Sequence, residues 1–178
     1  MAAGHYAATS FRTLGTAATP HNLLTIENTH ATTLVKIKRI TVQLDATAVL
    51  IAVMPAVKSG RATGVPTGGT TLAKTPFDTT ATSDGAIIVR GATASDGGAA
   101  TAITSTMGNI IWQQYCMRMH TVVGQVLAED SPLIPTLCET TPIILRQNEA
   151  LLVSVVAAIG TSNPATNHWA VQVAWEEV

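Results

Sequence analysis

The chain has 178 residues and a net charge of −1, and 12% of its residues are charged while 47% are hydrophobic. This length fits one all-β domain, or one domain plus an arm. The charged fraction is about half of the ~25% usual in soluble domains, which favours a surface covered by neighbouring subunits over a solvated monomer. The balance of charge argues against nucleic-acid binding, which needs a concentrated basic face.

The first fifteen residues lack the apolar region of a secretory signal peptide, and no run approaches the ~20 apolar residues of a membrane span. We therefore expect no membrane partner and synthesis in a cytoplasm. Cys116 and Cys138 lack metal-ligand spacing and are expected as two buried thiols in a reducing compartment, with a disulfide between them as the alternative.

Residues 1–19 are rich in Ala, Thr and Gly and are weakly patterned, which predicts an N-terminal arm or a peripheral strand. One sandwich domain is expected over 20–178. It begins with a short strand at 21–27 and continues with a long strand at 31–44. The apolar residues of the second strand change parity partway, which predicts a β-bulge near Lys38–Arg39.

A turn at 45–46 is expected to lead into 47–57, a nearly continuous apolar strand buried on both faces. Residues 58–85 are rich in Gly, Thr, Ser and Pro and predict a long loop segment. A short strand at 71–78, with Leu72 and Phe77 facing inward, is expected within it. Residues 86–90 (AIIVR) predict another strand, followed by a Gly-rich loop at 91–108.

Residues 109–121 match both a helical stripe and a strand, and their β-rich context favours the strand. A loop is expected at 122–141. The strands 142–146 and 149–158, joined by Gln147-Asn148, have the pattern of a β-hairpin. After a loop at 160–167, residues 169–176 alternate strictly between apolar and other residues, which predicts a half-buried closing strand.

Eight or nine strands without a confident helix predict an antiparallel β-sandwich, jelly-roll-like, with long loops. No repeat of 20–50 residues is visible in the chain.

The search for catalytic and metal-binding patterns yields no site. The five histidines lack HxH, HxxE or HExxH spacing, so a cupin-type metal site is only a distant third reading: His5, His21, His30, His120 and His168. Ser154 lies in a strand without a base, and the Gly-rich stretches at 64–69 and 91–98 form no phosphate-binding fingerprint.

Two acidic pairs, Glu129-Asp130 and Glu176-Glu177, are expected as solvated charge, with weak Ca²⁺ binding as the alternative. The basic triplet Lys36, Lys38 and Arg39 is expected as a solvated face or a protected sheet edge rather than a phosphate site.

The three tryptophans, Trp112, Trp169 and Trp175, could form a platform for stacking sugars. Because Trp169 and Trp175 share a strand face with valines, core packing is favoured. We thus expect no catalytic, cofactor-binding or metal-binding residues.

Four segments resemble small β-rich virion proteins of tailed phages, of the capsid decoration, head-fibre or minor capsid type: TIENT (25–29), VKIKRITVQLD (35–45), PIILRQNEALLVSVV (142–156) and VQVAWEE (171–177). The resemblance covers 20–178 and rests on structural motifs. It implies a jelly-roll subunit that forms homotrimers, often on a capsid lattice, and it supplies no functional residues.

The expectation is therefore a non-enzymatic virion structural protein. It is made in the host cytoplasm and has copies of itself, the major capsid protein or other virion proteins as partners. The alternative is a glycan- or receptor-binding knob of a phage fibre or tail, with Trp112, Tyr115, Glu129 and Asp130 as the candidate contacts.

Overall fold

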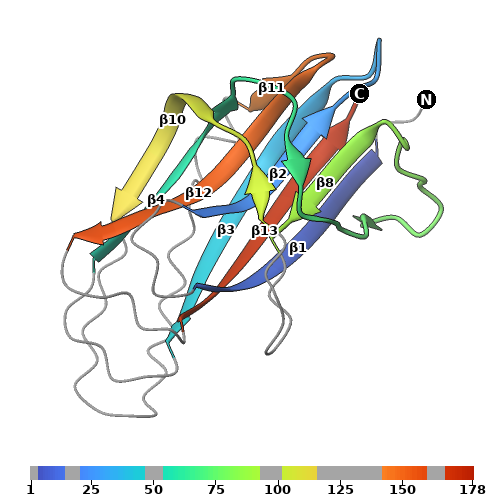
Figure 1. Ribbon diagram of the computed structural model, residues 1–178. Helices are drawn as coiled ribbons and strands as arrows, with labels where there is room; N and C mark the ends of the chain where they lie inside the picture. Colours follow the sequence, from blue (N-terminus) through green and yellow to red (C-terminus); the bar gives the residue numbers. More distant parts are fainter. Residues whose placement is uncertain (1–3, 15–20, 47–53, 93–101, 116–141, 160–166) are drawn as a thin grey trace.

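A computed structural model describes residues 4–14, 21–46, 54–92, 102–115, 142–159 and 167–178. Within these ranges every regular element is a β-strand. The strands form two antiparallel sheets that pack against each other (Figure 1). The predicted all-β sandwich is therefore confirmed.

The first sheet has five strands in the order β11 (Ile143–Leu145), β3 (Val35–Ala46), β13 (Asn167–Glu177), β1 (Gly4–Leu14) and β7 (Thr75–Pro76). The second sheet has six strands in the order β10 (Met107–Tyr115), β4 (Met54–Ala62), β12 (Glu149–Ile159), β2 (His21–Asn28), β8 (Ile87–Gly91) and β6 (Thr70–Thr71). A separate small sheet pairs β5 (Thr67–Gly68) with β9 (Ile103–Thr104).

The connections make this sandwich a jelly roll. The strands β1, β2, β3 and β4 alternate between the two sheets, and so do β10, β11, β12 and β13. The late strands return beside the early ones, because β13 lies between β3 and β1 while β12 lies between β4 and β2. Two interlocked Greek keys of this kind are the jelly-roll arrangement. The short strands β5 to β9 are inserted between β4 and β10.

The closing strand is half-buried, as its alternation predicted, and it occupies the centre of the first sheet. Val171, Val173 and Trp175 are at most 1% exposed, whereas Gln172 between them is exposed. Residues 4–14, expected within an arm or a peripheral strand, form β1, and β1 pairs with β13 over its whole length.

The predicted β-bulge is confirmed at Lys38. Opposite β13, Arg39 pairs with Ala174 and Ile37 with Trp175, so Lys38 is the extra residue. The bulge lets Ile37 and Ile40, which have opposite parity, both point into the core, where they are 0% and 1% exposed.

Three boundaries expected from local composition are wrong. Asp45 and Ala46 are not a turn, since they pair with His168 and Asn167 and prolong β3. Residues 58–62 are not loop but part of β4, held between β12 and β10. Residues 107–108, expected in a loop, open β10. In each case pairing with a distant strand overrides the weak local preference of polar and small residues.

The expected strand at 71–78 is two short pieces, β6 and β7, rather than one strand. Leu72 packs against the core as predicted, but Phe77 is 69% exposed, so its inward orientation is wrong. The strand prediction for 109–121 is confirmed as far as Tyr115, and 116–121 lie outside the described residues.

The predicted hairpin at 142–158 is also wrong, although both of its strands exist. β11 pairs with β3 in the first sheet, while β12 pairs with β2 and β4 in the second. Asn148, with a φ of 61°, turns the chain from one sheet to the other. Alternation identifies strands but not their neighbours, and both edges of β12 are occupied by longer partners.

The main core lies between the sheets, and a smaller cluster of Leu152, Ala92, Ile103 and Met107 lies on the outer face of the second sheet. Consecutive residues 150–154 of β12 are therefore all buried. The sequence had predicted a strand buried on both faces at 47–57, not at β12. Of that range, 47–53 and the side chains of 54–56 lie outside the description, and Val57 is buried.

Candidate functional site

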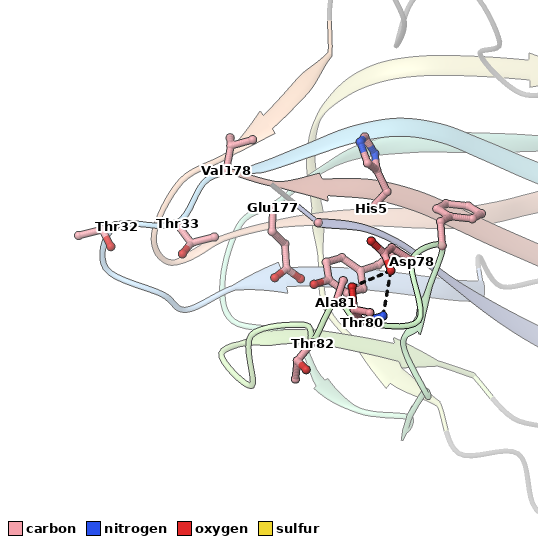
Figure 2. A pocket seen from close by; sticks show the side chains of 12 residues that line it. His5, Thr32, Thr33, Asp78, Thr80, Ala81, Thr82, Glu177 and Val178 are labelled. Carbon is pink, nitrogen blue, oxygen red and sulfur yellow. Dashed lines mark hydrogen bonds between the residues drawn. The ribbon is translucent and has the colours of Figure 1, made fainter. Parts of the chain in front are cut away.

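A hollow of about 830 Å³ opens at the end of the sandwich where β1 begins and β13 ends (Figure 2). Two loops complete it, one at 32–33 between β2 and β3 and one at 77–82 between β7 and β8. Its lining is Gly4, His5, Tyr6, Thr32, Thr33, Phe77, Asp78, Thr80, Ala81, Thr82, Glu177 and Val178.

The carboxylate of Glu177 lies in this hollow and accepts three hydrogen bonds. The indole N–H of Trp175 donates to it over 3.0 Å, the Ser83 hydroxyl over 2.7 Å and the Asp84 backbone N–H over 3.0 Å. Glu177 is only 8% exposed, so its expected role as solvated charge is wrong. It has the same parity as Val171, Val173 and Trp175, and that parity was the available signal.

Tyr6 lines the hollow and stacks on a tryptophan of the core. The rings of Tyr6 and Trp175 stack with centroids 5.8 Å apart. A Cβ at Gly4 would lie 2.6 Å from Cε2 of Tyr6, so the glycine leaves room for the tyrosine ring. Burial, and then the carboxylate of Glu177, raise the pKa of the Tyr6 hydroxyl. The hydroxyl therefore stays protonated at neutral pH.

A second polar cluster holds the two loops together. Nε2 of His30 lies 3.1 Å from Oδ2 of Asp84, while Nδ1 accepts hydrogen bonds from the backbone N–H groups of Thr32 and Thr33. Lys74 donates to the backbone oxygens of Asp84 and Ile87. Burial lowers the pKa of Lys74, and the charges of Glu177 and Asp84 oppose this. These contacts tie the loop after β2 to the segment that leads into β8.

Asn28 ends β2, and its side chain connects the loop that follows β2 with β11. Its Nδ2 donates to the backbone oxygens of Thr33 over 2.7 Å and of Leu145 over 3.0 Å, and its Oδ1 accepts from the backbone N–H of His30 over 2.9 Å. The side chain is fully buried. It has the same parity as Leu24 and Ile26, and this parity was the available signal of its burial in the sequence.

The rim of the hollow presents Asp78 beside the exposed ring of Phe77. Oδ1 of Asp78 accepts hydrogen bonds from the backbone N–H and the hydroxyl of Thr80, at 2.9 and 2.8 Å (Figure 2). These two bonds hold the pKa of Asp78 below its ordinary value. The carboxylate is therefore charged and fixed in direction at neutral pH.

The residues singled out in the sequence are spread over several parts of the described structure, and only some of them meet. Lys38 forms an ion pair of 2.7 Å with Glu176, whose pKa its hydrogen bond and charge lower. The hydroxyl of Ser154 donates to Asn22 inside the second sheet. Trp112 is partly buried and packs against the main core, and Trp175 is fully buried, as expected for core residues.

Several candidates lie outside the description. Cys116, Cys138, His120 and the pair Glu129-Asp130 belong to 116–141, and the side chains of His21, Tyr115, His168 and Trp169 are likewise outside it. Of the described histidines, His5 lines the hollow and His30 pairs with Asp84. The described part of the chain contains no group of three or more His, Cys, Asp or Glu that could hold a metal ion.

The outer edge of β10 is a second candidate for function. Figure 1 shows β10 at the margin of its sheet, beside β4, and no other described strand pairs with it. Residues 107–115 contain no charged side chain, and the neighbouring Ile110 and Ile111 are 48% and 43% exposed. Sheet edges that must not associate usually present charges, proline or a covering loop.

Glu27 is buried in β2, 3% exposed, and its Oε2 has no hydrogen-bond partner. Burial raises the pKa of Glu27, and the charge of Arg90 offsets this only in part. Because the folded state holds this proton more tightly than the unfolded state, stability is lost as the pH rises through the raised pKa.

We expect Glu27→Gln to remove that loss. The free energy of unfolding of the variant minus that of the wild type should increase as the pH rises from below 4.5, the ordinary pKa of a Glu, to neutral. Urea denaturation at both ends of this range measures the difference. An equal difference at both pH values would contradict the assignment.

Comparisons with known proteins give no relatives. No protein-family model matches the sequence, and neither a curated protein nor a solved structure does. Among the described residues no helix has the length and hydropathy needed to cross a bilayer.

Proposed function

We propose that the chain is a non-enzymatic structural subunit of a virion, a capsid decoration or minor capsid protein that assembles with copies of itself on the particle surface. The observation that supports this most directly is the uncharged edge of β10 with its exposed Ile110 and Ile111. An extended, uncharged strand edge offers backbone groups and apolar side chains for pairing with another chain.

The topology and the chemistry of the described residues agree with this proposal. Jelly rolls are common in viral capsid proteins, although they also occur in lectins and cupins, so the fold alone does not decide the function. Several of the ionisable side chains at the end of the sandwich are engaged in internal contacts. His30, Asp84 and Glu177 each have partners within the fold.

A homotrimer is the expected assembly, and the partners are the major capsid protein or other virion proteins. In a three-fold ring the contact is heterologous, so the edge of β10 on one subunit meets a different surface of the next. The low charge of the sequence fits a surface that becomes covered on assembly.

Substitution at the edge tests the proposal. Ile110→Lys and Ile111→Lys place a charge on the strand edge, and each is expected to convert the trimer into a monomer at micromolar concentration. Sedimentation velocity measures the state, and binding to capsids that lack the protein measures attachment. Val65→Lys is the matched control, because Val65 is 65% exposed in a loop and should leave both unchanged. A wild-type monomer that binds no capsid would overturn the proposal.

The fibre-knob alternative remains a prediction. Of its four candidate contacts, Trp112 packs against the core, while the side chains of Tyr115, Glu129 and Asp130 lie outside the description. No described contact favours that set of residues over the structural role.

A further inference from the structure

We propose that the hollow at the end of the sandwich, between the loops at 32–33 and 77–82, binds a neutral saccharide. Phe77 would stack on an apolar face of a sugar ring and Asp78 would accept hydrogen bonds from its hydroxyl groups. This site shares no residue with the candidate contacts of the knob alternative, and it does not depend on the proposed virion role.

The exposure of Phe77 is the first step of the argument. The ring is 69% exposed and lines the hollow, although a backbone hydrogen bond from Phe77 to His5 holds the segment firmly beside β1. Burying this ring in the fold would gain free energy, and the fold does not do so. An aromatic face held at the rim of a cavity suits a ligand with polarised C–H groups, since the face is the negative part of the ring.

Asp78 supplies a fixed acceptor next to that ring. Thr80 occupies Oδ1 with two hydrogen bonds, and no hydrogen bond from the described residues reaches Oδ2. Since these bonds also keep the group ionised, Oδ2 can accept from neighbouring sugar hydroxyls through charge-assisted hydrogen bonds, which are the stronger kind.

The rest of the lining supplies weaker polar contacts. Figure 2 shows the side chains of Thr32 and Thr33 on one side of Glu177 and those of Thr80 and Thr82 on the loop that carries Asp78. Hydroxyl groups can both donate to and accept from a sugar. A volume of about 830 Å³ lies within the ~300–1,000 Å³ of small-molecule sites, so one or two sugar rings fit.

The charges of the lining select a neutral ligand. Asp78 and Glu177 are carboxylates, and His5 is the only basic side chain among the lining residues. Burial lowers the pKa of Lys74 and the charge of Glu177 opposes this, so the two groups lie near each other. Lys74 nevertheless donates to backbone oxygens and is not part of the lining. A sugar carboxylate would meet like charge, which disfavours acidic saccharides.

Saturation-transfer NMR and isothermal titration calorimetry test the proposal on the full chain. The neutral probes are maltose, lactose and cellobiose, and the acidic probes are glucuronic acid and N-acetylneuraminic acid. We expect at least one neutral disaccharide to bind and neither acidic sugar to do so. Phe77→Ala and Asp78→Asn should each weaken binding about tenfold, as expected for one lost stacking contact or one lost charge-assisted hydrogen bond.

The controls separate binding from folding. Val65→Ala removes an exposed apolar side chain away from the hollow and should leave the affinity unchanged. Phe77 and Asp78 are both exposed, so their variants should keep the wild-type melting temperature. The proposal is overturned if no neutral probe binds, if acidic sugars bind equally well, or if Phe77→Ala and Asp78→Asn retain full affinity.

Discussion

Trp175→Ala is expected to lower the free energy of unfolding by about 3–5 kcal/mol, a large part of the ~5–15 kcal/mol typical of a domain. Trp175 is fully buried in the central strand of the first sheet and stacks on Tyr6. Its indole N–H is also one of the three hydrogen-bond donors to Glu177. The truncation therefore opens a cavity and leaves a buried carboxylate with fewer partners.

Urea denaturation measures this loss, and Trp175→Phe is the matched control. Phenylalanine keeps an aromatic ring against Tyr6 but cannot donate to Glu177, so a smaller loss is expected for it. If the two variants lost the same stability, packing would not be the main contribution of this side chain. If alanine cost less than about 1 kcal/mol, the side chain would not occupy a packed core.

Asn28→Asp is expected to destabilise the fold by about 3 kcal/mol or more at neutral pH, although the two side chains have nearly the same shape. The new carboxylate oxygen would replace Nδ2 and face the backbone oxygens of Thr33 and Leu145, to which Nδ2 now donates. Burial raises the pKa of such a carboxyl above its unfolded value. Stability should therefore recover as the pH falls, since the folded state binds the proton more tightly.

Urea denaturation across the acid range measures both effects. Asn148→Asp makes the same chemical change at an exposed turn residue with a φ of 61°, a backbone conformation that Asp also tolerates, and should cost little. A loss at Asn28 that does not depend on pH, or a loss equal to that at Asn148, would contradict the role given to the buried amide.

The burial of two polar residues, Asn28 and Glu177, could have been predicted from the sequence. Asn28 follows Leu24 and Ile26 at the same parity, and Glu177 follows Val173 and Trp175 in the same way, so both sit on the inward face of their strands. Composition alone suggested solvated charge for Glu177. Side-chain parity was the better guide, because in a strand it determines which face of the sheet a residue occupies.

Their partners could not have been found in this way. Ser83 and Asp84 bind Glu177 across a sequence separation of more than ninety residues, and no local pattern marks the loop that brings them there. Phe77 illustrates the opposite failure, since an aromatic residue in a short extended segment is usually placed inward. Only the path of that loop along β1 leaves its ring at the surface.

The sequence by itself predicted the long strands, the inward face of the closing strand from Val171 to Trp175 and a bulge near Lys38–Arg39, because apolar alternation and its change of phase are local properties. The tertiary structure alone decided which strands are neighbours. It separated the apparent hairpin of β11 and β12 into two sheets, prolonged β3 and β4 through polar residues, and assembled the hollow from segments far apart in the chain. The physical reason is that backbone pairing depends on which edges are free in space, and a one-dimensional pattern does not contain that information.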